Sequence, residues 1–177
     1  MMNTMFQQHS DEILFPGDDH PLPFFFVGDD AFPMREWLMK PYPIRGMTHS
    51  ERVFNYRLSR ARRVVENAFG ITAHRFRCML GTMLPDPDVV EDAVLACCTL
   101  HNYLREKQPT LTLSLVDTED PNTHEVIPGS WRTDRALDGL EKMRGNNALQ
   151  KAKGQREYLT QYYSSAQGRV EWQDRMV

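Results

Sequence analysis

The chain has 177 residues, about the length of one ordinary domain. Hydrophobic residues make up 41% and charged residues 25% of it, which is the composition of a globular protein and excludes a wholly disordered chain. No apolar run approaches the roughly 20 residues of a membrane helix, and we expect no secretory signal, since no basic flank precedes an apolar segment near the start. Three cysteines, Cys78, Cys97 and Cys98, are too few for a disulfide framework and predict reduced thiols in a cytosolic or nuclear protein.

The net charge of −3 is unevenly distributed along the chain. Residues 1–30 hold six acids and no Lys or Arg, residues 31–80 hold ten Lys or Arg and three acids, and the remainder is mildly acidic. A basic centre between acidic flanks indicates a surface that could meet a polyanion, although a solvated helix face explains the same charges.

The first part of the chain predicts little regular structure. Residues 1–22 are expected to be an irregular acidic arm, because they carry Pro and Gly without hydrophobic periodicity. The run Phe24–Val27 stops at Gly28-Asp29, a pattern typical of a buried strand. Further strand candidates are few, at 37–39 and 111–116.

The pattern after residue 48 predicts a long helix. Thr48 and Glu51 have the spacing of a capping box, which marks a helix start. Apolar residues then recur at spacings of three and four over about 30 residues, roughly 45 Å, and Gly70 could end or bend the helix. Seven arginines lie off the apolar stripe: Arg52, Arg57, Arg60, Arg62, Arg63, Arg75 and Arg77.

The second half of the chain predicts more helix. Asp86-Pro87 marks the start of a second helix, and a third helical region is predicted over 131–164. Residues 107–130 are expected to be mostly loop, and residues 166–177 a flexible tail.

Two acids could carry chemistry. Asp29 ends the predicted strand, where ligand sites of α/β folds cluster, and Glu66 lies on the arginine-rich helix. Two carboxylates brought together repel unless a cation lies between them, and Mg²⁺ or Mn²⁺ prefers such oxygen ligands. The pair could therefore clamp a phosphodiester through metal ions. The alternative is that Asp29 begins a turn and Glu66 pairs with a neighbouring arginine.

A weaker cluster lies on the second predicted helix. Cys97, Cys98 and His101 could suggest zinc, but no second ligand pair stands at a zinc-finger spacing. The alternative is that the cysteines are small core residues and that His101 is hydrogen-bonded.

Several ordered blocks together resemble the PIF/Harbinger transposase family, whose host relatives are the Harbinger transposase-derived nucleases. The similarity covers most of the chain after about residue 22 and corresponds to the C-terminal part of the family's nuclease domain. The blocks are Phe26-Val-Gly-Asp-Asp-Ala-Phe-Pro33, Trp37-Leu-Met-Lys-Pro41, Phe54 to Gly70, Arg75-Phe-Arg77, Leu95 to Arg105 and Arg156 to Gln173.

The resemblance implies a fold and a metal site. The family has an RNase H-like nuclease domain in which an Asp, Asp, Glu triad binds divalent metals, Mg²⁺ or Mn²⁺; its second Asp corresponds to Asp29 and its Glu to Glu66. The first Asp lies upstream on an early strand, and the 28 residues before Asp29 contain no matching block. The implied fold is an RNase H-like α/β DDE nuclease fold lacking its N-terminal strands, mainly helical with one or two strands, over residues 23–165.

The resemblance also implies a function. It predicts a metal-dependent DNA endonuclease domain of transposase origin. The chain would be a C-terminal fragment of that domain and inactive alone, and its expected location is the nucleus or, alternatively, the cytoplasm. The implied partners are DNA and a Myb-like DNA-binding protein, with no membrane. The candidates for contacts to DNA phosphates are Arg57, Arg60, Arg63 and Arg75.

Two other interpretations stay open at this point. The chain could be a nuclease-dead remnant that acts as a DNA-binding or protein-interaction module, or a truncated gene whose missing exon carries the first Asp. Where strands are missing, apolar side chains lose their cover. We therefore expect Phe24, Phe26 and part of the Val64/Val65 face to be unusually exposed.

Overall fold

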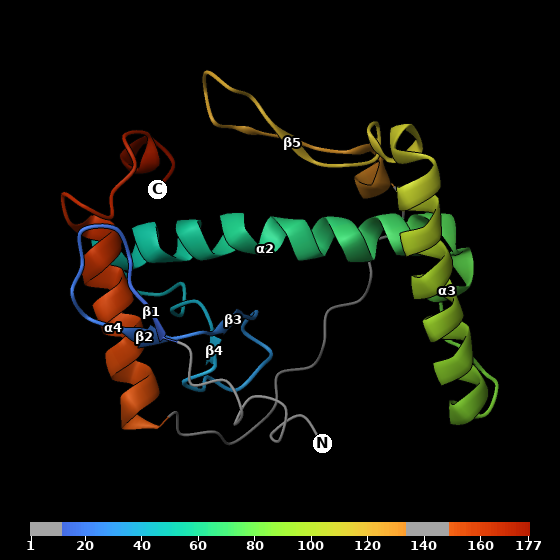
Figure 1. The fold of residues 1–177 in the computed structure, drawn as a ribbon, viewed down its shortest axis with the longest axis horizontal. Helices are drawn as coiled ribbons and strands as arrows, with labels where there is room; N and C mark the ends of the chain where they lie inside the picture. Colours follow the sequence, from blue (N-terminus) through green and yellow to red (C-terminus); the bar gives the residue numbers. More distant parts are fainter. Residues whose placement is uncertain (1–11, 134–148) are drawn as a thin grey trace. The chain divides into compact units, whose positions relative to one another are not determined.

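A computed structural model describes residues 12–133 and 149–177. The chain divides into two compact units: Met1–Arg62 with Leu140–Val177, and Arg63–Gly139. We call them unit 1 and unit 2. Within the described parts, no helix combines the length and apolarity needed to cross a membrane. Figure 1 labels the α-helices and most of the strands. The elements are β1 Glu12–Ile13, β2 Leu22–Pro23, β3 Phe26–Val27, β4 Leu38–Met39, α2 His49–Arg75, η1 Arg77–Leu80, α3 Pro87–Lys107, η2 Pro109–Thr112, β5 Thr118–Glu119, β6 Val126–Ile127, η3 Ser130–Thr133, α4 Gln150–Ser164 and η4 Gln173–Arg175.

The capping box forms as predicted at the start of α2. The Thr48 backbone amide donates to Glu51 Oε2 at 2.7 Å, and the Glu51 amide donates to Thr48 Oγ1 at 3.3 Å. These reciprocal bonds satisfy amides that a helix start leaves without partners. Gly70 lies inside the helix and does not end it.

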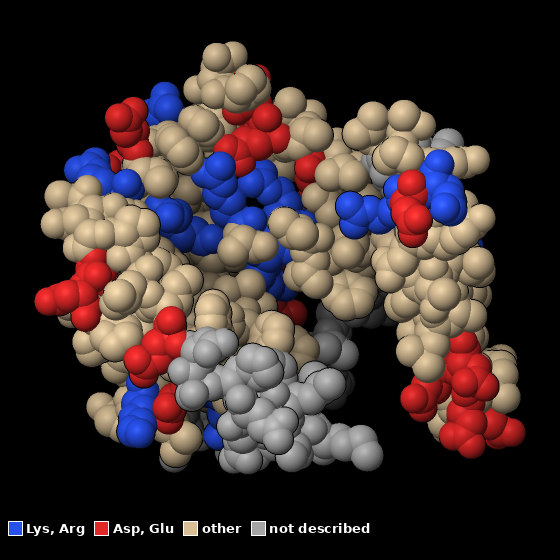
Figure 2. Space-filling view, viewed as in Figure 1, with Lys and Arg blue, Asp and Glu red and all other residues tan. Residues whose placement is uncertain are grey.

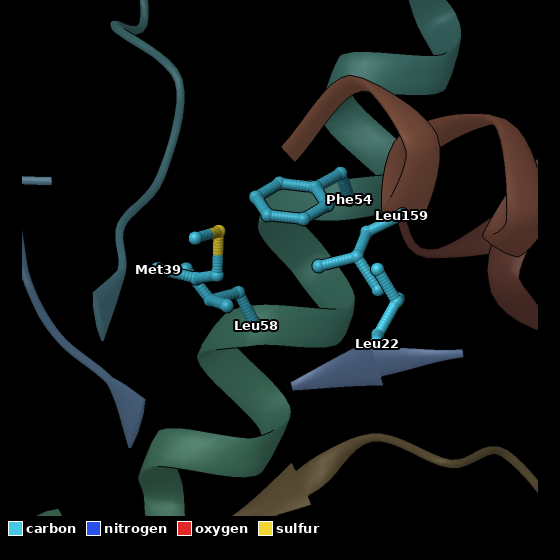
Figure 3. Packing of buried hydrophobic residues seen from close by; sticks show 5 residues of the cluster. All are labelled: Leu22, Met39, Phe54, Leu58 and Leu159. Atoms are coloured by element: carbon cyan, nitrogen blue, oxygen red, sulfur yellow. The ribbon is translucent and has the colours of Figure 1, made fainter. Parts of the chain in front are cut away.

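The core of unit 1 forms where α2, α4 and two strand pairs meet. Phe54 and Leu58 from α2 pack against Leu159 from α4, with Leu22 from β2 and Met39 from β4 closing the cluster (Figure 3). Phe54, Met39 and Leu159 are fully buried. Burying such side chains stabilises a fold by about 1.5–3 kcal/mol each, so this cluster fixes the strands to the helices.

The two ends of the described chain are packed rather than loose. Residues 12–22, expected to be part of an irregular arm, form the antiparallel pair β1–β2 and place Leu22 in the core. At the C-terminal end, where a flexible tail was predicted, Gln173 is buried and donates to the Tyr163 carbonyl at 2.9 Å. Polar contacts with α2 and α4, which sequence patterns do not reveal, account for this order.

The segment before Asp29 is a strand, but it is not buried. β3 pairs in parallel with β4, with Phe26 opposite Leu38 and Val27 opposite Met39. Phe24 and Phe26 are 58% and 52% exposed, so the expectation of a buried strand is wrong. The expectation that Phe24, Phe26 and the Val64/Val65 face would be unusually exposed is confirmed, since Val64 is 76% exposed.

In unit 2, α3 begins at Pro87 as the sequence predicts. Residues 111–116 are not a strand: η2 and a turn occupy that stretch, and the hairpin β5–β6 follows it. An alternation of Leu with Thr and Ser is compatible with a 3₁₀ turn as well as a strand, and hairpin pairing depends on contacts beyond the local sequence.

The fold class is mixed α/β, as expected, and about half of the described residues are helical. Instead of one or two strands, the described residues contain six strands of two residues each, in three separate pairs. The predicted helix over 131–164 is represented by η3 and α4, with 134–148 outside the described residues. The RNase H-like topology and the domain limits 23–165 stay predictions.

Candidate functional site: two carboxylates in arginine-rich surroundings

Asp29 lies in the loop that follows β3. Its Oδ1 accepts from the Ala31 amide at 2.9 Å, forming the turn that the sequence left open as an alternative. Its Oδ2 lies 3.8 Å from Arg62 Nη2, and the carboxylate is 38% exposed. The local backbone therefore fixes one oxygen of Asp29, while the other faces a cation and solvent.

The block Trp37 to Pro41 supports this loop. β4 holds β3 through bonds from the Phe26 amide to the Trp37 carbonyl and from the Gly28 amide to the Met39 carbonyl, both 2.8 Å. Lys40 Nζ then reaches across to the Asp30 carboxylate at 3.1 Å and to the Phe32 carbonyl at 3.2 Å. Two blocks that look separate in sequence thus form one structure that positions Asp29.

Glu66 lies on α2 within unit 2. Its Oε2 is 3.6 Å from Arg132 Nη2, and its side chain is 34% exposed. Glu66 thus pairs with an arginine, as the alternative interpretation expects, and this contact is made by Arg132 of η3, 66 residues further along the chain. Sequence separation of this size leaves no periodic signal.

Arg132 is held in place by Asp117. The Asp117 carboxylate is fully buried and receives Arg132 Nε at 2.9 Å and Nη2 at 2.6 Å, together with the Gly129 amide at 2.8 Å. Burial opposes ionisation of Asp117, but these hydrogen bonds outweigh burial and hold the pKa of the carboxyl below its usual value. The guanidinium facing Glu66 is therefore fixed by a bidentate ion pair.

Asn67, next to Glu66, ties the same segment to α2. Its buried Oδ1 accepts from the Asp117 amide and from Trp131 Nε1, both at 2.9 Å. Gly70 completes the contact, because a Cβ there would lie 2.2 Å from Trp131 Cε3. The run Glu66 to Gly70 thus combines a partly exposed acid with a docking surface for residues 117–132, a role that sequence reasoning missed.

The four arginines predicted to contact phosphate differ in their surroundings. Arg57 donates to the Gly168 carbonyl and to Gln173, and stacks on Tyr163 with 4.8 Å to the ring centroid. Arg60 stacks on Trp172, and Arg63 pairs with Glu119 at 2.7 Å. Arg75 is half-buried, and its Nη1 has no hydrogen-bond partner among the described residues. Arg57 and Arg63 therefore already serve the fold.

Charge is unevenly spread over the surface. In Figure 2, Lys and Arg side chains show along the stretch where α2 runs. Acidic side chains gather at the N-terminal end of α3, which carries Asp86, Asp88, Glu91 and Asp92. Side chains of the predicted basic centre are thus visible at the surface along α2, although acidic side chains of the protein neutralise part of their charge.

The residues present do not by themselves build a metal centre. Across 12–133 and 149–177, no three His, Cys, Asp or Glu side chains gather closely enough to hold a metal ion. Asp29 belongs to unit 1 and Glu66 to unit 2, and each faces an arginine of its own unit. Their approach to one another stays a prediction. Cys97 and His101 are buried and Cys98 is exposed on α3.

Comparison with known proteins places the chain in a family. The model of the DDE superfamily endonuclease matches residues 4–102, which include Asp29 and Glu66. The chain is 32% identical over 81 residues to "Protein ALP1-like" of Arabidopsis thaliana, covering 45% of this chain and 20% of that protein. It is 36% identical over 85 residues to human "Putative nuclease HARBI1" and 35% identical over 81 residues to the Xenopus laevis protein of that name.

The extent of these matches is limited. The human match covers 46% of this chain and 24% of that protein, and the Xenopus match 44% and 23%, so the chain spans about a quarter of the length of these relatives. No solved structure matches the chain significantly. Together, the family match over more than half of the chain and the named relatives show that the chain belongs to the DDE superfamily endonucleases of the Harbinger type.

Proposed function

We propose that the chain is part of a metal-dependent DNA endonuclease of transposase origin and supplies two of its three metal-binding carboxylates, Asp29 and Glu66. The observation that carries this proposal is the local setting of each acid inside a family block. A turn fixes Asp29 and α2 presents Glu66, yet both side chains stay more than a third exposed. Acids needed only for folding are more often closely bonded, as Asp117 is.

A bound Mg²⁺ or Mn²⁺ would supply charge neutralisation and an activated water. Hard oxygen ligands such as these two carboxylates suit either ion, but the described residues offer no third one beside them. We therefore assign no hydrolytic step to this chain alone. The family's first Asp would have to come from outside the described residues.

The arginines that face the acids favour a second candidate, a nuclease-dead module that binds DNA or protein. Arg62 lies 3.8 Å from Asp29 and Arg132 lies 3.6 Å from Glu66, where a metal ion would otherwise be expected. A cation entering beside either carboxylate meets like charge, which weakens its binding. DNA as a substrate, a Myb-like partner and a nuclear location belong to the first proposal and are tested with it.

Mn²⁺ binding by the full chain tests the assignment of the two acids. Asp29→Asn keeps an acceptor for the Ala31 amide but removes the charge, and Glu66→Gln does the same on α2. We expect both variants to weaken Mn²⁺ binding. The measurement is electron paramagnetic resonance, which reports the concentration of free Mn²⁺. Asp30→Asn is the matched control, because Asp30 is the adjacent acid and pairs with Lys40. Unchanged Mn²⁺ affinity in both variants would overturn the assignment.

Nicking of supercoiled plasmid in Mn²⁺ tests the incomplete site. The wild-type chain is expected to nick slowly or not at all, since residues 12–133 and 149–177 offer no third carboxylate beside the two acids. Robust nicking that Asp29→Asn abolishes would show that another group of this chain completes the centre. No Mn²⁺ binding and no nicking, with retained salt-sensitive DNA binding, would favour the nuclease-dead module.

A further inference from the structure

A cavity of about 340 Å³ lies within unit 2. α2, α3 and residues 116–119 enclose it. Val64, Ala68 and Ile71 of α2 form an apolar wall. The lining also contains five titratable side chains, Arg63, His101, Arg105, Asp117 and Glu119. The cavity has the chemistry of a binding site rather than of a packing defect in an apolar core.

His101 is a deeply buried polar group of this cavity. It is 5% exposed, and its Nδ1 has no hydrogen-bond partner among the described residues. Burial, and then the nearby charges of Arg75 and Arg105, lower the pKa of the imidazole. His101 is therefore neutral at pH 7 but lies among cations that an incoming anion would compensate.

The arginines of this region keep unused donors. Arg63 gives Nη2 to Glu119 at 2.7 Å, while its Nη1 is buried with no hydrogen-bond partner in the described parts of the chain. Arg75 lies close to His101, and its Nη1 is likewise buried with no hydrogen-bond partner among the described residues. Leaving a buried donor without an acceptor costs about 1–3 kcal/mol, and more for a charged group.

The two acids of the cavity wall are already engaged by other residues. Asp117 receives Arg132 and the Gly129 amide. Glu119 receives both Arg63 at 2.7 Å and His124 Nδ1 at 2.9 Å. Donors thus exceed acceptors around His101, and a ligand with several acceptor oxygens would restore the balance.

We propose that this cavity binds a phosphate-class anion, with Arg63, His101 and Arg105 as its donors. Arginine provides a planar fork of donors that matches phosphate oxygens. The apolar wall of Val64, Ala68 and Ile71 leaves room for a group attached to the phosphate. This site requires neither a metal ion nor strand cleavage, so it stands apart from the proposed nuclease function.

The test follows the imidazole signals of the full chain by NMR in the presence of a metal chelator, with His101→Gln used to assign the His101 signal. The probes are inorganic phosphate, deoxythymidine 5′-monophosphate and a single-stranded DNA oligonucleotide. We expect a saturable shift of the His101 signal and a higher pKa of His101 in the bound form. Because binding raises the pKa of His101, protonation of the imidazole favours the bound form, and binding of the oligonucleotide, whose phosphodiesters keep their charge, should strengthen as the pH falls through that pKa.

Two variants address the site by different routes. Arg105→Gln removes a donor and should weaken phosphate binding about tenfold, the effect of one lost hydrogen bond to a charged group. Lys107→Gln makes the same charge change at the end of the same helix, away from the cavity, and should change affinity less than about twofold. Ala68→Leu should abolish phosphate binding, because the larger side chain fills the cavity without altering its charge.

The outcomes separate the possible sources of the anion. Displacement of phosphate by the oligonucleotide identifies the DNA backbone as the source, and displacement by the mononucleotide alone identifies a small phosphate ligand; either result supports the site. The absence of a saturable His101 shift with all three probes would overturn it. So would equal weakening by Arg105→Gln and Lys107→Gln, because that result means general charge attraction. Circular dichroism verifies that each variant is folded.

Discussion

The buried amide of Asn67 joins α2 to residues 117–131, and we expect its loss to be costly. In Asn67→Ala, the Asp117 amide and Trp131 Nε1 both lose their acceptor. The loss of an acceptor for one buried and one partly buried donor should lower the free energy of unfolding by about 2–4 kcal/mol, measured by urea denaturation. Asn102→Ala, at an exposed position of α3, should stay within about 0.5 kcal/mol. Equal effects of the two substitutions would contradict this role.

Asp117 should make unit 2 sensitive to acid. In the folded state the pKa of Asp117 lies below its ordinary value of 3.8, so the ionised carboxylate stabilises the folded state above pH 3.8. This stabilisation disappears as the pH falls through the lowered pKa of the folded state. Asp117→Asn lacks the contribution at every pH. The difference in unfolding free energy between wild type and variant should therefore be constant between pH 5 and 7 and shrink below about pH 4. A difference independent of pH would rule out the buried ion pair with Arg132.

At the scale of elements, two helix glycines should respond to the same substitution with opposite sign. In Gly70→Ala, the new methyl would collide with Trp131, and overpacking of this kind costs about 1–3 kcal/mol. Gly154 of α4 is exposed, and no atom lies within 4 Å of a Cβ built there. Gly154→Ala should therefore stabilise the chain by about 0.5–1 kcal/mol through helix propensity. Thermal melts of both variants decide the point, and a destabilising Gly154→Ala would contradict the packing described for α4.

The elements that the sequence predicts correctly are those specified locally. The capping box of Thr48 and Glu51 and the proline at the start of α3 act within one helical turn. The docking of Asp117 on Asn67 joins residues 50 positions apart, and no periodicity announces such a contact. Asp29 and Glu66 are candidates from their positions at a strand end and on an arginine-rich helix, and the family blocks strengthen both assignments. Arg132 could have been suspected only from its place beside Trp131, an aromatic residue in an otherwise polar loop.

For the whole molecule, exposed apolar side chains predict self-association. α3 presents Val89, Leu95, Leu100 and Tyr103, each at least half exposed. Surfaces of this kind gain free energy when they are covered, at about 25 cal/mol per Å². We expect the molar mass measured by light scattering to rise with concentration, and the double substitution Leu95→Glu and Leu100→Glu to reduce the rise. A mass that stays monomeric at all concentrations in the wild type would contradict this expectation.

The shared use of the run Glu66 to Gly70 has a consequence for tracing how transposases become host genes. Selection for a stable protein would preserve Asn67 and Gly70 through their contacts with Asp117 and Trp131, whether or not a lineage still cuts DNA. An intact Asn-Ala-Phe-Gly run in a genome is therefore weak support for a working enzyme. The presence or loss of the acids themselves distinguishes a descendant that kept its metal-binding carboxylates from one that kept only the fold.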